Sequence, residues 1–247
     1  MNRRESLRAV VACGVAAAGL TGCTTRGGAT PTTTGHTAVP AGSAPAAPGG
    51  HHVTLPPEVT HGPRDRPVVA LTFHGQGEPA MVTQLLAELE AGGARVTVLA
   101  VGSWLAAHPS MARRILDGGH ELGNHTLHHR AIGQMSAAQA YTEINGCAEV
   151  LSRLTGSIGR WFRPSQTRHA DAVIRTQSRR AGYATCLSYD VDSLDYTDPP
   201  AARVVATTLE AVRAGSIVSM HCGHAVTVAA IGPILDGLRR RGLRAMT

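Results

Sequence analysis

Two histidines four residues apart, His125 and His129, suggest a chemical role for this chain. They lie in Gly123-Asn124-His125-Thr126-Leu127-His128-His129, which holds three of the thirteen histidines of the sequence. If this stretch forms one helical turn, both imidazoles project from the same face. That arrangement suits two nitrogen ligands on one divalent metal ion. A polar surface turn is the alternative interpretation.

Polar residues also stand at the ends of several predicted strands. The carboxyl ends of parallel barrel strands meet at one mouth, so residues there lie close together in space. These residues are His74-Gly75, His125 with His129, Arg163-Pro164, Asp190 with Asp192 and Asp195, and His221. Five strand ends that carry histidine, arginine and aspartate together predict a shared site.

The elements that position these residues alternate between strand and helix. Strands are predicted over 68–73, 95–101, 121–124, 161–163, 183–191, 216–221 and 243–246. Helices are predicted over 80–91, 103–116 with a break near Pro109, 136–155, 170–181, 201–214 and 226–241. Such alternation predicts a mainly parallel sheet with helices outside it. About seven units without a Gly-rich dinucleotide fingerprint favour an α/β barrel over an open sheet.

The first 23 residues have the pattern of an export signal. Arg3, Arg4 and Arg8 form a basic start, and the apolar run over 10–20 is too short to span a bilayer comfortably. Leu20-Thr21-Gly22-Cys23 resembles a bacterial lipobox, which implies lipid attachment at Cys23. An ordinary secretory signal is the alternative. We therefore expect an exported protein, either lipid-anchored to the outer face of the cytoplasmic membrane or secreted.

Residues 24–64 are rich in Pro, Thr, Ala and Gly, a composition that buries too little apolar surface to offset its ordering entropy. We expect a disordered tether there and one catalytic domain over 65–247. The formal charge of +6 comes from arginines that form no stripe, and aromatic residues make up 3% of the chain. No nucleic-acid partner is expected. Cys147, Cys186 and Cys222 allow one disulfide with a thiol, or three thiols.

Five ordered motifs carry a family resemblance. They are Val69-Ala70-Leu71-Thr72-Phe73, His125-Thr126-Leu127-His128-His129, Phe162-Arg163-Pro164, Asp192-Ser193-Leu194-Asp195-Tyr196 and Ile217-Val218-Ser219-Met220-His221. From about Pro67 to Thr247 the sequence resembles the polysaccharide deacetylases of the NodB-homology type, carbohydrate esterase family 4. The resemblance implies a distorted seven-stranded (β/α) barrel that hydrolyses acetyl groups on N-acetylated polysaccharide such as peptidoglycan or chitin-like glycan.

The resemblance also implies roles for individual residues. His125 and His129 would bind a divalent metal ion, with zinc as the expected ion, which polarises the acetyl carbonyl and activates water. His221 would be the general acid that protonates the leaving amine. Arg163 and Asp195 would form an ion pair that orients these groups.

The first motif departs from the family. Two adjacent aspartates, a catalytic base and a metal ligand, are replaced here by His74-Gly75. His74 is expected to supply a third nitrogen ligand, which makes a three-histidine zinc site of a known type. The base would then be Glu78, Asp190, Asp192 or water. In the alternative, two histidines bind metal weakly and the protein binds glycan without turnover.

Overall fold

The computed structural model describes residues 55–247. The predicted export signal over 1–23, the lipid-attachment residue Cys23 and most of the predicted tether lie outside the described residues. The end of that tether prediction is wrong, because residues 55–64 belong to the fold. Strand β1 (Glu58–Val59) pairs with β5 (Cys186–Leu187), and the Gly62 N–H donates to the Gly215 carbonyl over 2.7 Å.

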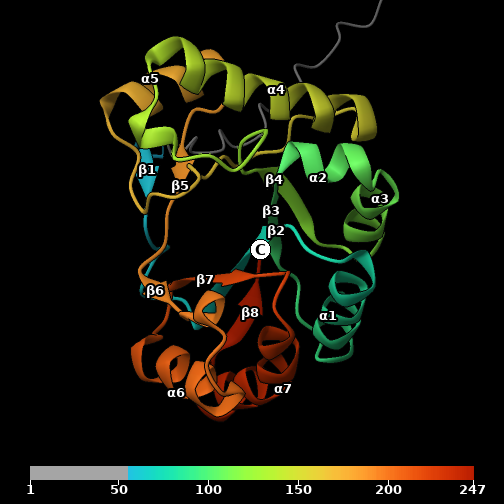
Figure 1. Ribbon diagram of the computed structural model, residues 1–247. Coiled ribbons are helices and arrows are strands. Elements are labelled where there is room, and N and C mark those ends of the chain that lie inside the picture. Colours follow the sequence, from blue (N-terminus) through green and yellow to red (C-terminus); the bar gives the residue numbers. More distant parts are fainter. Residues whose placement is uncertain (1–54) are drawn as a thin grey trace, which may run out of the picture. The chain divides into compact units, whose positions relative to one another are not determined.

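The main sheet has six parallel strands, in the order β4-β3-β2-β7-β6 with β8 against the first half of β2. Their bounds are β2 Val68–Gly75, β3 Thr97–Ala100, β4 Glu121–Asn124, β6 Val191–Asp192, β7 Ile217–His221 and β8 Arg244–Met246. Strand β2 is central because it pairs with β3, β7 and β8 (Figure 1). The predicted parallel α/β architecture is confirmed.

Single bridges continue the sheet beyond β4. Asn124 bridges to Phe162, and Phe162 bridges to Cys186 of β5. The predicted strand over 161–163 is therefore one bridge, and the predicted strand over 183–191 is divided into β5 and β6. The two halves have different partners, because β5 pairs with β1 and β6 pairs with β7. Between them, the Asp190 N–H donates to the Ile217 carbonyl over 3.2 Å and the Asp190 carboxylate accepts the Ile217 N–H over 2.8 Å. The arrangement follows the (β/α) barrel pattern, with its ladder of hydrogen bonds interrupted at these points.

Helices lie outside the strands, as predicted (Figure 1). They are α1 Pro79–Ala91, α2 Gly102–Ala107, α3 Ser110–Asp117, α4 Ala137–Thr155, α5 Ala172–Arg180, α6 Ala201–Ala211 and α7 Ala225–Arg240. Helix α4 begins with a capping box, in which the Ser136 hydroxyl accepts the Gln139 N–H and the Gln139 side chain accepts the Ser136 N–H. Helix α4 therefore starts where the sequence predicts.

The core fills the space between β2 and the helices. Leu71 and Phe73 of β2 are fully buried against the apolar faces of α1 and α7. Burial of such side chains stabilises the fold by about 1.5–3 kcal/mol each. The cysteines at 147, 186 and 222 are buried free thiols, which selects the three-thiol alternative. Among the described helices, none combines the length and apolarity needed to cross a bilayer.

Candidate active site

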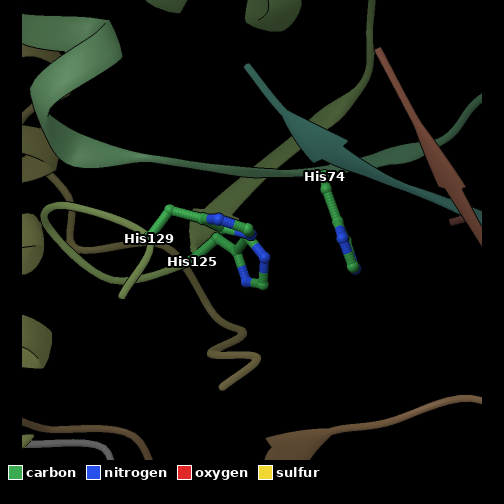
Figure 2. Close-up of side chains that lie close together, drawn as sticks. All are labelled: His74, His125 and His129. Carbon is green, nitrogen blue, oxygen red and sulfur yellow. The ribbon is translucent and has the colours of Figure 1, made fainter. Parts of the chain in front are cut away.

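Three imidazoles meet at the carboxyl end of the parallel strands (Figure 2). His74 lies at the end of β2, and His125 and His129 lie in the loop after β4. One ring nitrogen from each lies within 4.8 Å of the other two. The ring centroids are 4.2 Å apart for His74 and His125, and 4.9 Å apart for His125 and His129. We call these three residues the histidine cluster.

The loop that holds two of these histidines is not helical, so the two imidazoles are not brought together by one helical turn. Thr126 and His129 adopt left-handed backbone angles, with φ of 68° and 53°. The Thr126 N–H donates to Asn124 Oδ1 over 2.8 Å, and the His129 N–H donates to Thr126 Oγ1 over 3.2 Å. Polar side chains that bond back to their own backbone thus fold the loop and bring the imidazoles together.

His125 has the hydrogen bonding of a metal ligand. Its side chain is fully buried, and Nδ1 lies 3.0 Å from the Arg163 carbonyl oxygen. Because only an N–H can donate to that carbonyl, the lone pair is on Nε2. Nε2 has no partner among the described residues. Metal-binding histidines usually donate their other ring N–H to such an acceptor, so the residues present fit a divalent ion.

Burial also sets the protonation state of the histidine cluster. Burial lowers the pKa of His74, His125 and His129 more than any other cause does. The positive charges of neighbouring residues lower these pKa values further. The neutral imidazole is therefore the form present near neutral pH. Neutral imidazole is also the form that binds a metal ion.

The lowered histidine pKa values predict acid sensitivity of the metal-free protein. Above pH about 6.5, His74 and His125 are neutral in both the folded and the unfolded chain and contribute no pH dependence. Below that pH the unfolded chain binds more protons, so stability falls by up to about 1.4 kcal/mol per pH unit for each histidine. Thermal melts of chelator-treated protein at pH 7.5 and 5.5 should show a lower Tm at pH 5.5. The decrease should be smaller in His125→Gln, and an equal decrease would contradict this cause.

Arg163 lies next to His125, and its guanidinium has no carboxylate partner among residues 55–247. Its side chain is 1% exposed, and its guanidinium donates to the Leu187 and Ser188 carbonyls and to Thr72 Oγ1. Nη1 has no partner within residues 55–247. Burial lowers the pKa of Arg163 to about 9, so the side chain is still a cation at neutral pH. The predicted ion pair between Arg163 and Asp195 is wrong.

Asp195 is instead bonded to His221, on the β7 side of the cavity. Asp195 Oδ1 lies 2.7 Å from His221 Nδ1, and Oδ2 accepts the His221 N–H over 2.8 Å and the Thr227 hydroxyl over 2.6 Å. Burial raises the pKa of Asp195, but the bonds from His221 and Thr227 outweigh it, and the net pKa lies below the ordinary value. The carboxylate is thus ionised and fixes the His221 ring, leaving Nε2 free to carry a proton.

Only one of the three candidate base carboxylates lines the cavity. Asp192 is on its wall. Asp190 pairs with Arg64 over 2.7 Å and with the start of β7, so it has a structural role. Glu78 is the N-cap residue of α1 and lines a different depression.

Gly75, the second position of the divergent motif, has no room for a side chain. A Cβ atom there would lie 2.7 Å from Val98 Cγ1 and 2.9 Å from the Cα atom of Ala100. Both distances are shorter than carbon atoms tolerate. Packing against β3 therefore excludes a carboxylate at position 75 in this backbone, and the cavity obtains its third candidate ligand from position 74.

The cavity at the cluster has a volume of about 340 Å³. It is lined by His74, His129, Pro164, Gln166, Thr167, Arg168, Tyr189, Asp192, Tyr196, Ser219 and His221. Sequence reasoning did not identify Thr227, Arg168, Tyr189 or Ser219. Arg168 follows the Phe162-Arg163-Pro164 motif closely, which was the available signal for that residue. Ser219 lies in the Ile217-Val218-Ser219-Met220-His221 motif, two residues before His221 and on the same face of the strand, which was the signal for it. Thr227 gave no signal, since its role depends on how α7 packs against β7.

Comparison with known proteins identifies relatives that match about three quarters of the chain. A sequence model described as polysaccharide deacetylase matches residues 61–186. A peptidoglycan-N-acetylglucosamine deacetylase of Bacillus cereus is 29% identical over 189 residues, which cover 75% of this chain and 88% of the relative. The structure of a family 4 carbohydrate esterase from Streptomyces lividans, in complex with acetate, matches with a TM-score of 0.67 and 29% identity over 72% of this chain and 91% of that one.

A family 4 pseudoenzyme from Bacillus anthracis has the same fold. It matches with a TM-score of 0.73 and 20% identity, and the match covers 78% of this chain and 68% of that one.

Proposed function

The chain belongs to the polysaccharide deacetylase family, and from this premise we propose that it hydrolyses acetyl groups on an N-acetylated glycan with a divalent metal ion held by His74, His125 and His129. The observation that supports this proposal best is the buried, unpartnered Nε2 of His125, which lies among two further neutral imidazoles. Zinc is the ion that best suits three nitrogen ligands and an open fourth position.

The chemistry needs a nucleophile and a proton donor. A divalent ion with three neutral ligands keeps its full charge, so it would polarise the acetyl carbonyl and lower the pKa of water. Asp192 is the carboxylate on the cavity wall that can accept the proton of the attacking water. The water oxygen bonds to the acetyl carbon, and the bond from that carbon to nitrogen then breaks. His221, oriented by Asp195, delivers a proton to the leaving amine.

Substitution of His74 tests whether it acts as the third ligand. His74→Ala should lower zinc affinity by about 100-fold or more, because even the loss of an outer-shell partner costs about 10- to 100-fold. The measurement is metal content after dialysis against a zinc buffer, together with acetate release from N-acetylated glycan. His169→Ala, which removes an imidazole that is 59% exposed and lies 3.5 Å from Glu58 Oε1, outside the histidine cluster, is the control that should retain zinc. If His74→Ala retained zinc but lost turnover, His74 would be a general base and not a metal ligand.

A second candidate function is glycan binding without turnover. The observation that favours it is the excluded carboxylate at Gly75, since the family motif has an aspartate there. On this alternative the purified protein binds glycan fragments yet releases no acetate in the presence of Zn²⁺, Co²⁺ or Mn²⁺. Acetate release with any of these ions supports the hydrolase.

We also propose that the protein acts outside the cytoplasmic membrane, lipid-anchored through Cys23 or secreted. The basic and apolar start of the chain and the Leu20-Thr21-Gly22-Cys23 motif support this proposal. An acetylated envelope glycan would be accessible there. Mass spectrometry of membrane fractions would detect acylated Cys23.

A further inference from the structure

Arg168 is an exposed arginine whose side chain is fixed in place on the cavity wall. Its Nε and Nη2 atoms lie 3.3 and 3.1 Å from the Tyr189 carbonyl oxygen, and Nη2 also donates to the Asp190 carbonyl over 3.1 Å. Its guanidinium carbon lies 4.9 Å from the centroid of the Tyr189 ring. Surface arginines lose rotamer entropy when they are ordered in this way, so these contacts pre-organise the group.

The supports of Arg168 are themselves rigid. The buried Ser188 hydroxyl donates to the Arg168 carbonyl over 2.6 Å and fixes its backbone. The Tyr189 ring also lies 5.3 Å from the guanidinium carbon of the buried Arg163. The position of the Arg168 charge is therefore determined by the barrel and not by a mobile loop tip.

The charge of Arg168 has no anionic partner within the described part of the chain. Its hydrogen-bond acceptors are neutral carbonyl oxygens, and Nη1 takes part in none of these bonds. Asp192 is the acidic residue of the same wall, and its Oδ1 already accepts the Leu194 N–H over 3.0 Å. A guanidinium fork with a free edge is the group best suited to bind a carboxylate.

We propose that Arg168 binds a carboxylate on the sugar chain, so that the preferred substrate is an acidic N-acetylated glycan and not a neutral one. This inference rests on the proposed function, because Arg168 lines the same cavity as His74 and His129 of the histidine cluster. In an acidic glycan, the carboxylate would contact Arg168 while an acetamido group of the same chain lies at the cluster. A neutral chitin-like oligomer has no anionic group that could pair with the Arg168 guanidinium.

The test compares two glycans that differ only in charge. A peptidoglycan-derived tetrasaccharide with free lactyl carboxylates and the same tetrasaccharide with these groups converted to methylamides are titrated by calorimetry into metal-free protein. The wild-type protein should bind the acidic form about 10- to 100-fold more tightly, the range expected for one charge-assisted hydrogen bond. Salt at 0.5 M should reduce the difference, because the side chain is exposed.

Three variants test whether Arg168 causes the preference for the acidic glycan. Arg168→Gln should remove the preference, Arg168→Lys should restore part of it, and Arg203→Gln, which neutralises an exposed arginine on α6, should leave it unchanged. Equal affinity of the wild-type protein for both glycans would overturn the inference, as would a preference that survives in Arg168→Gln. Because binding is measured without metal or turnover, an absence of acetate release in a separate zinc-loaded assay would count only against the proposed hydrolysis.

Discussion

Replacement of His125 by alanine is expected to lower zinc affinity by more than about 100-fold and to abolish acetate release. His125 is the fully buried member of the histidine cluster, and its Nε2 has no hydrogen-bond partner in the described part of the chain. Loss of a direct ligand should cost more than the factor of about 10–100 that follows loss of an outer-shell partner. The measurement is competition for zinc with a chromogenic chelator at pH 7.5, followed by acetate release at saturating zinc.

His128→Ala is the matched control for this experiment. His128 lies in the same loop, but its side chain is 45% exposed and its Nδ1 is 2.9 Å from Glu143 Oε1, on the α4 side. Its backbone N–H bond to Glu143 is independent of the side chain that is removed. His128→Ala should therefore retain zinc. Equal loss of zinc in both variants would indicate loop collapse and would remove this support for the metal site.

Replacement of His221 by alanine is expected to leave zinc binding intact and to lower kcat by about 10²- to 10⁴-fold. This is the usual contribution of a positioned general acid or base. His221 lies near the cluster, with its ring 4.4 Å from that of His74, but its Nδ1 is bonded to Asp195. Zinc content and acetate release measured on the same preparation separate the two effects. Loss of zinc together with turnover would assign His221 to the ligand set and contradict the proposed role.

Asp195→Asn provides a second test of the same role. An amide keeps the size of the side chain but cannot hold His221 as the carboxylate does, and the Thr227 hydroxyl loses a charged acceptor. The kcat should fall while zinc content stays at the wild-type value. Thr227→Val, which removes one hydrogen bond and leaves the carboxylate, should have a much smaller effect on kcat.

The sequence predicts regular elements well where local signals agree. The apolar, β-branched start of β2 and the Ser136 N-cap of α4 are local features, and both elements lie where expected. The predicted strand over 183–191 is divided because β5 pairs with β1 and β6 pairs with β7, and these pairings join residues distant in sequence. Residues 55–64 were assigned to the tether because composition cannot show that Glu58–Val59 pairs with β5.

At the candidate site, too, the sequence predicts which residues take part but not how they are arranged. The residue types and the convergence of His74, His125, His129 and His221 could be read from strand ends. The geometry of the site could not be predicted from the sequence, because the positive φ angles of Thr126 and His129 accompany side-chain hydrogen bonds within the folded loop. The partner of Asp195 likewise depends on how β7 and α7 pack, so motif order alone led to the wrong pair.

The tight packing at Gly75 makes the divergence of this motif difficult to reverse. Since Val98 and the backbone of Ala100 occupy the space beside it, the aspartate of the family motif could not be accommodated by substituting Gly75 alone. Reversion would require shortening Val98 and shifting β3 in the same step. The divergent motif therefore presents a candidate metal ligand at position 74, whose side chain lines the cavity, and leaves no space for one at position 75.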